Sequence, residues 1–445
     1  MNIPSRHLEA YPYGPGRWLI YNRLWPSPVL VSADVLKLLD ILGENPDAAN
    51  GCEGSISYLG RLREHSIVFE DAEAEASRLA DQHRRWLDEA GRGGTLRTLI
   101  LNVDTRCNMR CTYCNVRKFR EMHRMPPAGP MHAETAERSV SGFAEILKMN
   151  GNRGRLVFFG GEPLMNENLV FDTARWVREK GWDHLDLSVN TNGVLLTREK
   201  IRRLKELGCA IALSLDGLAE TNDRFRKDAH GNGTFAILDW AVRTIVDEGC
   251  PLVVLTTLQS ASFEELDRFQ AYLAATGVIN WSVKLPTFEK RDSDIYTSSH
   301  VSQWAEAMVR VFGRANEDGM SVTGIPGQKF TGCEGVGRMA SVEPDGTVFP
   351  CPGGIPVKLG GCDDLLSIVE SPAFLQVCER TLAMLPECRS CPAAGMCAGS
   401  CPADAMHMTG KYLGHNPLIC RFMRELVRLS LLHASPAPRA PEGGQ

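Results

Sequence analysis

The sequence predicts an α/β protein with a parallel sheet at its centre, a small module before the sheet and a cysteine-rich segment after it. Three observations support this prediction. Apolar runs alternate with helical patterns through the middle of the chain, short strands and helices come before them, and the alternation stops where glycine, proline and cysteine become frequent. We expect an N-terminal module over 1–92, the core over 93–320, a cysteine-rich domain over 321–430 and a disordered tail over 431–445.

Composition favours a globular cytoplasmic protein that binds metal. The net charge of −5 gives no indication of nucleic acid or an anionic membrane as a partner. The first residues lack the apolar region of a signal peptide, and no apolar run approaches the roughly 18 residues of a membrane span. In a reducing compartment, 15 cysteines point to metal ligation; a secreted disulfide protein is the alternative.

The first 92 residues resemble a winged-helix module. Residues 18–31 predict two short strands around a proline-marked turn, and Ser32 is placed to cap a helix over 33–44. More helix is expected in 55–69, and 73–90 reads as a charged amphipathic connector. The predicted apolar side of the first helix consists of Val35, Leu36, Leu38, Leu39 and Ile41.

Six apolar runs in the core predict buried parallel strands. Helical patterns at 133–149, 197–208 and 233–249 separate some of them, so that strands and helices follow each other along the chain. This order predicts a (β/α)6 sheet curved into an incomplete barrel, with the catalytic residues at the edge where the strands end. The six runs are 96–103, 155–160, 184–190, 210–216, 251–258 and 279–286.

The stretch "DTRCNMRCTYCNVRKF" follows the first predicted strand and contains Cys107, Cys111 and Cys114. A structural zinc ion takes four protein ligands, and histidine is a frequent fourth, but this loop contains none. A 4Fe–4S cluster normally takes four thiolates. Three thiolates would therefore leave one iron open to a small molecule.

A C-x3-C-x2-C loop ahead of a parallel barrel resembles the radical S-adenosylmethionine (SAM) superfamily. "FFGGEPLMN" at the second strand resembles the GGEP segment of that family, and "LSLDGLAETNDRFR" at the fourth resembles its SLDG segment. The resemblance implies a partial (β/α)6 TIM-like barrel and a cluster whose open iron binds SAM. Cys107, Cys111 and Cys114 would be the catalytic cluster ligands, and the cleaved SAM would abstract hydrogen from an unactivated C–H bond.

The resemblance also implies which residues contact SAM. Glu162 and the neighbouring glycine backbone would accept from the methionyl ammonium, while Ser214 and Arg226 would hold the ribose and carboxylate end. Tyr113 and Leu285 would line the adenine pocket. The alternative is that these motifs are ordinary turns and helix caps. The full set is Tyr113, Gly160, Gly161, Glu162, Asn190, Asn192, Ser214, Arg226 and Leu285.

The C-terminal cysteines are very similar in spacing to the seven-cysteine signature of SPASM domains, which hold auxiliary 4Fe–4S clusters in peptide-modifying radical SAM enzymes. A zinc ribbon is the alternative, because Cys388 and Cys391 have finger-like spacing. The family's interleaved ligation would give one cluster Cys388, Cys391, Cys397 and Cys420 and the other Cys333, Cys351 and Cys401.

The fourth position of the second auxiliary cluster is not assigned by this resemblance. It could be an open iron, another ligand or Cys362. The remaining cysteines lie in apolar or helical contexts and are expected to be buried thiols. They are Cys52, Cys209, Cys250 and Cys378.

These resemblances predict a radical SAM/SPASM maturase of a ribosomally made precursor peptide, whose leader binds the N-terminal module. A carbon–carbon, thioether or ether crosslink is the favoured product, and a flavodoxin- or ferredoxin-type protein is the expected reductant. A formylglycine-forming sulfatase maturase is less favoured, because Pro352 stands where that group has an acidic residue. A radical SAM dehydrogenase, an iron–sulfur electron-transfer scaffold and a zinc-stabilised nucleic-acid binder are also less favoured. The peptide, its modified residue and the oligomeric state are not determined.

Overall fold

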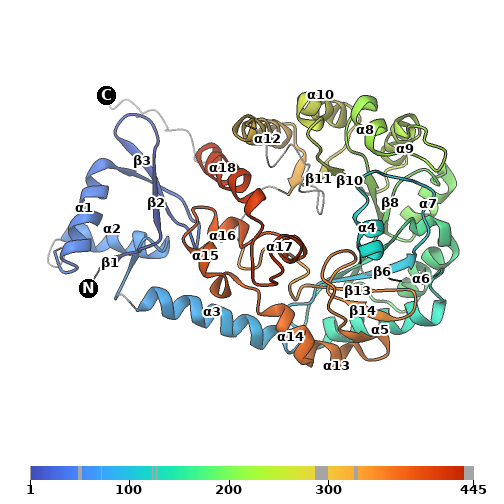
Figure 1. The fold of residues 1–445 in the computed structure, drawn as a ribbon, viewed down its shortest axis with the longest axis horizontal. Helices are drawn as coiled ribbons and strands as arrows, with labels where there is room; N and C mark the ends of the chain where they lie inside the picture. The colour runs from blue at the N-terminus through green and yellow to red at the C-terminus, as the bar shows by residue number, and fades with distance from the viewer. Residues whose placement is uncertain are drawn as a thin grey trace.

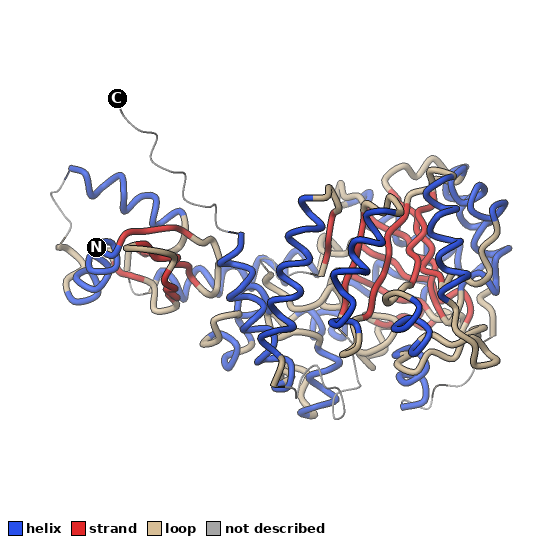
Figure 2. Tube along the Cα trace, turned by 90° about the horizontal axis from the view of Figure 1, so that it is seen from above, coloured by secondary structure: helices blue, strands red, loops and turns tan. Residues whose placement is uncertain are grey.

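The computed structural model describes residues 2–48, 53–71, 73–122, 125, 129–285, 299–324 and 329–434. The molecule is elongated, with the N-terminal module at one end and the parallel sheet with its helices at the other (Figures 1 and 2). The C-terminal helices lie between them. Within the described ranges, no helix is both long and apolar enough to cross a membrane. The predicted α/β fold class is confirmed.

The N-terminal module contains two small antiparallel sheets and two helices. Leu39 and Leu42 are buried on the first helix, but Ile41 is 51% exposed, so its place on the apolar side was wrong. Positions 39 and 42 are three residues apart and share one helix face, whereas 41 points away from it. The elements are β1 (Ile3–Pro4), β2 (Leu8–Pro12), β3 (Arg17–Asn22), β4 (Val29–Ser32), α1 (Ala33–Glu44), α2 (Glu53–Glu64) and β5 (Val68–Phe69).

Strand β5 pairs with β1 and ends the helical pattern that was expected to continue to residue 69. The strands β2, β3 and β4 form the second sheet, in that order. Leu42, Leu62 and Ile67 belong to the core that joins these sheets to α1 and α2. Cys52 lies outside the described residues.

The connector forms helix α3 (Ala74–Ala90), which runs from the N-terminal module along the C-terminal segment (Figure 1). The indole Nε1 of Trp86 donates to the carbonyl oxygen of Cys378 at 2.9 Å, and the Nδ1 of His83 lies 2.8 Å from the hydroxyl of Thr381. These contacts anchor α3 to the cysteine-rich segment.

The central sheet is larger than the six predicted strands. Its order is β12-β11-β10-β9-β8-β7-β6-β13-β14-β15, and the pairings from β12 to β13 are all parallel. The predicted runs correspond to β6 (Thr98–Asp104), β7 (Gly154–Gly160), β8 (Leu185–Thr191), β9 (Cys209–Ser214), β10 (Leu252–Thr257) and β11 (Asn280–Lys284). The helices after them are α4 (Asn115–Met122), α5 (Ala133–Met149), α6 (Glu167–Glu179), α7 (Arg198–Glu206), α8 (Ala219–Phe225), α9 (Phe235–Asp247), α10 (Ser262–Ala275) and α12 (Val301–Glu317).

The C-terminal segment shares this sheet. β12 (Ser321–Thr323) extends it past the expected boundary at residue 320, and β13 (Met339–Val342) pairs with β6. Helix α18 (Pro417–Ala434) continues four residues past 430, so residues 431–434 are helical, contrary to the expected start of a disordered tail. The other elements are β14 (Thr347–Phe349), β15 (Gly360–Gly361), α13 (Leu365–Glu370), α14 (Pro372–Cys378), α15 (Pro386–Arg389), α16 (Ala394–Cys397) and α17 (Pro402–Thr409).

Candidate active site and auxiliary cysteine sets

The cysteine loop (residues 107–114) connects the end of β6 to α4. Backbone N–H groups already point at two of its sulfurs: Met109 donates to the Sγ of Cys107 at 3.4 Å and Arg117 to the Sγ of Cys114 at 3.5 Å. Burial raises the pKa of Cys107 to about 11, and the nearby Cys111 and Cys114 add to that rise. The loop therefore gathers its three thiols in one partly buried place.

The two glycines of the GGEP segment allow β7 to approach the cysteine loop. A Cβ atom on Gly160 would lie far inside contact distance of the Asp104 carbonyl oxygen, and one on Gly161 would collide with that of Arg106. The N–H of Gly161 donates to Asp104 O at 2.8 Å. We expected these glycines to let the backbone approach a ligand closely. In the structure they let the end of β7 pack against Asp104 and Arg106, directly before the cysteine loop.

Glu162 is fully buried, and its carboxylate holds the end of β8. Its Oε1 accepts from the hydroxyl of Thr191 at 2.7 Å, and its Oε2 accepts from the backbone N–H of Asn192 at 2.8 Å. Burial raises the pKa of Glu162 to about 7, although these hydrogen bonds oppose the rise. Glu162 therefore holds the end of β8 in place. Its expected role as an acceptor for the methionyl ammonium of SAM stays a prediction.

Asn192 connects the end of β8 to the cysteine loop. Its Nδ2 donates to the side-chain oxygen of Asn108 at 2.7 Å and lies 3.8 Å from the Sγ of Cys107. On the other side of the loop, the N–H of Arg110 donates to Lys227 O at 2.8 Å and that of Thr112 donates to Phe225 O at 3.0 Å. The segments after β8 and β9 thus both hold the loop in place.

Asp216 is the shared acceptor in a buried hydrogen-bond network. It was not among the site residues expected from the sequence. Its carboxylate accepts from the Nε of Arg226 at 2.9 Å, from the Nη2 of the same guanidinium at 3.2 Å and from the hydroxyl of Tyr113. The Arg226 guanidinium also lies over the Tyr113 ring, 5.5 Å from its centre. Burial lowers the pKa of Arg226, but Asp216 outweighs that effect and raises it.

Arg226 uses its Nε and Nη2 to bind Asp216, which leaves the Nη1 hydrogens and the second Nη2 hydrogen for a ligand carboxylate. Its expected contact with the carboxylate end of SAM stays a prediction. Tyr113 and Arg226 also join the cysteine loop to the segment after β9. The SLDG motif contains Asp216, so the signal was present in the sequence, but Asp216 was not among the expected SAM contacts.

Three expected SAM contacts remain open to a ligand. Ser214 and Asn190, on β9 and β8, have no side-chain hydrogen bond within the described part of the chain. Leu285 follows β11 and is partly buried against the core. Hydroxyl, amide and apolar groups at neighbouring strand ends suit the ribose, amino-acid and adenine parts of a sulfonium nucleotide. The residues present therefore fit SAM beside a loop of three thiols.

The C-terminal cysteines separate in space into two sets. In the four-cysteine set (Cys388, Cys391, Cys397 and Cys420), burial and the three neighbouring thiols together raise the pKa of Cys388 to about 12. In the three-cysteine set (Cys333, Cys351 and Cys401), hydrogen bonding to Cys401 is the main cause of the raised pKa of Cys333. The ligation of a cluster by each set stays a prediction. Among the described residues, no three His, Cys, Asp or Glu side chains converge closely enough for a single metal ion.

The four-cysteine set lines a cavity of about 340 Å³. Ile419, Met423 and Pro417 contribute apolar walls to it. A cavity with four thiols and apolar walls fits a 4Fe–4S cluster.

The other cysteines have different surroundings. Cys362 is 4% exposed and belongs to the central core, with its Sγ facing Gly346. Cys209, Cys250 and Cys378 are buried in the same core, as expected.

Helix α4 is tied to the C-terminal segment by a buried ion pair. The Nη1 of Arg120 lies 2.6 Å from the Oε2 of Glu343, and the Nδ2 of Asn102 donates to Oε1 of the same carboxylate at 2.8 Å. Glu343 lies between β13 and β14. The cysteine loop and the strand that leads toward Cys351 are therefore held in one unit.

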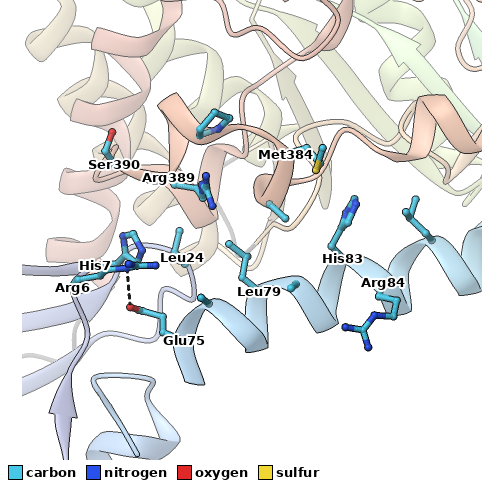
Figure 3. A pocket seen from close by; sticks show the side chains of 15 residues that line it. Arg6, His7, Leu24, Glu75, Leu79, His83, Arg84, Met384, Arg389 and Ser390 are labelled. Atoms are coloured by element: carbon cyan, nitrogen blue, oxygen red, sulfur yellow. Dashed lines mark ion pairs between the residues drawn. The ribbon is translucent and has the colours of Figure 1, made fainter. Parts of the chain in front are cut away.

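A second cavity, of about 820 Å³, lies where the N-terminal module, α3 and residues 383–390 meet (Figure 3). Its walls include Leu24, Leu79 and Met384, while Arg6, His7, His83, Arg84 and Arg389 surround them. Its one acidic residue, Glu75, is buried and accepts hydrogen bonds from Ser5 and Asn22. The cavity is thus apolar inside, with three arginines at its margin. Arg6 lies 3.7 Å from the Oε2 of Glu75 and Arg84 lies 2.9 Å from the Oδ1 of Asp81, while burial lowers the pKa of both His7 and His83.

Residues 101–272 match the family model described as the Radical SAM superfamily. The match includes the cysteine loop and the motifs that follow β7, β8 and β9. The chain is therefore a radical SAM enzyme, and this family implies SAM and a 4Fe–4S cluster as cofactors.

Similar proteins extend beyond that region. The chain is 21% identical over 386 residues to the radical SAM cyclopropyl synthase TigE of Paramaledivibacter caminithermalis, covering 82% of this chain and 80% of TigE. It is 23% identical over 341 residues to a cysteine-type anaerobic sulfatase-maturating enzyme of Clostridium perfringens, covering 69% and 88%. Both relatives are therefore similar to this chain over most of their own length.

A solved structure of Streptococcus suis SuiB bound to its precursor peptide SuiA shares the fold. Its TM-score is 0.58 at 14% sequence identity, and the match covers 95% of this chain and 100% of that one. The shared fold therefore includes the N-terminal module as well as the sheet.

Proposed function

We propose that the protein modifies a ribosomally made precursor peptide and that the product is a crosslink within that peptide. The observation that carries this proposal is the presence of three separate groups of thiols, one at the strand ends and two in the C-terminal segment. The relatives named above include a cyclopropyl synthase, and the SuiB structure holds a precursor peptide. The SuiB structure supports a peptide substrate, and the cyclopropyl synthase supports ring closure as the kind of product.

Cys107, Cys111 and Cys114 would hold the catalytic 4Fe–4S cluster, with Ser214, Asn190 and the Gly160–Gly161 backbone around SAM. When bound, the cluster and SAM supply a 5′-deoxyadenosyl radical that removes a hydrogen atom from the substrate. The protein positions the substrate C–H bond at the strand ends and keeps water away from it. Tyr113, Asp216 and Arg226 hold the loop in place for this step.

The two C-terminal sets would hold two auxiliary 4Fe–4S clusters. Closing a crosslink after hydrogen removal releases one further electron, and an auxiliary cluster provides an acceptor for it. A flavodoxin- or ferredoxin-type protein would supply the electron that starts the reaction.

A second candidate function is formylglycine formation, because the sulfatase-maturating relative matches 69% of this chain. Pro352, directly after Cys351, disfavours it. The two functions differ in their substrate. Mass spectrometry distinguishes them by showing which peptide is modified.

The proposal is tested on the product of a short open reading frame next to this gene. The peptide, the anaerobically reconstituted enzyme, SAM and dithionite are incubated together, and the peptide mass is measured. A loss of two hydrogen masses with an internal linkage in the fragment spectrum is the expected result. An unchanged peptide together with conversion of a sulfatase peptide to formylglycine would favour the second candidate.

Replacing Cys391 should distinguish the role of the catalytic cluster from that of the auxiliary clusters. Cys391→Ala removes a ligand from the four-cysteine set and leaves the cysteine loop intact, so we expect SAM cleavage to continue while peptide modification stops. Iron content, 5′-deoxyadenosine and modified peptide are measured on one preparation. Full peptide modification by this variant would contradict the auxiliary role.

We further propose that the 820 Å³ cavity binds an acidic, partly apolar stretch of the precursor's leader, because Arg6, Arg84 and Arg389 line it beside apolar walls and its one carboxylate, Glu75, already accepts hydrogen bonds from Ser5 and Asn22. Arg84→Glu should weaken binding of the same neighbouring-frame peptide by roughly fivefold, as expected for reversal of one exposed charge. Arg85→Glu is the matched control, since Arg85 is the next residue on α3 and does not line the cavity. Equal affinities of the two variants, measured by fluorescence anisotropy, would show that the leader binds elsewhere.

A further inference from the structure

Arg380 is a fully buried arginine between the two C-terminal cysteine sets. Its side chain has no exposed surface, and none of the ion pairs among the described residues includes it. A buried guanidinium without a counterion costs several kcal/mol. Such a residue calls for an anionic partner.

Backbone carbonyl oxygens surround the guanidinium. Its Nε donates to Tyr412 O at 2.8 Å, its Nη1 to Ser400 O at 3.2 Å, and its Nη2 to Gly399 O and Gly414 O at 2.8 Å each. These bonds satisfy the N–H groups but bring no negative charge. The ionisable groups that face Arg380 are Tyr412 and three cysteines, Cys388, Cys401 and Cys333.

The carbonyls of Gly399 and Ser400 belong to the turn that separates the two sets. This turn runs from Cys397, in the four-cysteine set, to Cys401, in the three-cysteine set, and its three intervening residues all have positive φ: Ala398 at 47°, Gly399 at 81° and Ser400 at 58°. Left-handed backbone at alanine and serine costs about 1 kcal/mol or more each and persists only where neighbours hold it.

Other groups restrict the same turn. A Cβ atom on Gly332, directly before Cys333, would lie 2.5 Å from Ala398 O and 2.6 Å from Ser400 O. One on Gly399 would lie 2.6 Å from a methyl of Leu385 and 3.1 Å from Arg380 Nη2. Arg380 therefore acts at the point where the chain passes from one cysteine set to the other.

We propose that Arg380 is the shared countercharge of the two auxiliary clusters and the positioning residue that holds the turn between their ligands. This inference rests on the proposed function, because it requires a cluster in each set. A thiolate-bound cluster is anionic and becomes more so when it is reduced, so a fixed buried cation stabilises the reduced form and raises the potential.

The test is a potentiometric titration followed by electron paramagnetic resonance. Cys107, Cys111 and Cys114 are all replaced by alanine, so that only the auxiliary clusters contribute to the signal. In this background, Arg380→Gln should lower the ratio of reduced to oxidised cluster about tenfold at a given potential, which corresponds to about 59 mV for one electron. Arg380→Lys keeps the charge and should titrate near the parent.

The matched control is Arg424→Gln. Arg424 is exposed and lowers the pKa of Cys420, so it also stands beside a cluster, but water screens its charge and its loss should change the ratio much less. Equal potentials for the parent and Arg380→Gln, at equal iron content, would overturn the inference.

Iron and sulfide analysis separates the other outcomes. If Arg380→Gln loses iron, the iron content of Arg380→Lys is compared with it. Retention of iron by Arg380→Lys supports the proposal that Arg380 is a countercharge, and an equal loss of iron from both variants contradicts it. A parent protein with iron for only one cluster, measured with its cysteine loop intact, would instead refute the proposed function on which the inference depends.

Discussion

Cys111→Ala is expected to abolish the reductive cleavage of SAM. The loop offers three thiols, and a cluster that keeps only two of them loses both its anchorage and the geometry that leaves one iron open. The measurement is 5′-deoxyadenosine released from SAM by the anaerobically reconstituted protein with dithionite, together with the iron content.

Cys250→Ala is the control for this prediction. Cys250 is 5% exposed, and its Sγ lies 3.9 Å from the carbonyl oxygen of Cys209 within the core, so its replacement changes packing and leaves the cysteine loop unaltered. We expect this variant to cleave SAM like the parent. Cleavage at the parent rate by Cys111→Ala would mean that the loop does not hold the catalytic cluster.

Asp216→Ala should cause the second-largest loss. It removes the carboxylate shared by Arg226 and Tyr113 and leaves a buried guanidinium without its partner, a change that costs about 3–5 kcal/mol in other proteins. Because these residues join the cysteine loop to the segment after β9, SAM affinity and the rate of its cleavage should both fall. Calorimetric SAM binding and thermal unfolding measure the two effects.

Asp223→Ala is the control that distinguishes a general loss of stability from a specific loss of SAM binding. The carboxylate of Asp223 accepts from the N–H groups of Thr234 and Phe235 at 2.7 Å each, at the start of α9. Its loss should cost about 0.5–2 kcal/mol, as for other helix caps, with SAM affinity preserved. If the two aspartate variants lose SAM affinity equally, the network around Asp216 has no particular role in binding.

The motifs at the strand ends were predictable because they depend on local patterns and one general rule. Parallel strands joined by helices place all their carboxyl ends at one edge, so the loops after β6, β7, β8 and β9 had to meet there. The order of apolar runs therefore implied that the cysteine loop, the GGEP segment and the SLDG segment are neighbours. The sheet's extra parallel strands, β12 and β13, were missed because they are short and lie in segments without the alternating pattern.

The partners of individual side chains could not be predicted in the same way. Glu162, which was expected to face a ligand, also accepts hydrogen bonds from the end of β8, and two guanidinium nitrogens of Arg226 bind Asp216. Which acceptor a buried donor reaches depends on distances between segments far apart in the chain. Local sequence patterns contain no information on those distances.

The sequence by itself determined the fold class and the three-cysteine loop, because spacing and periodicity are properties of neighbouring residues. Only the tertiary structure decided how these parts are held together. Burial removes water from Asp216, Glu162 and Arg380, and each must then find its partners within the protein. Those partners lie on other segments, so packing, and not spacing along the chain, assigns each of these residues its role.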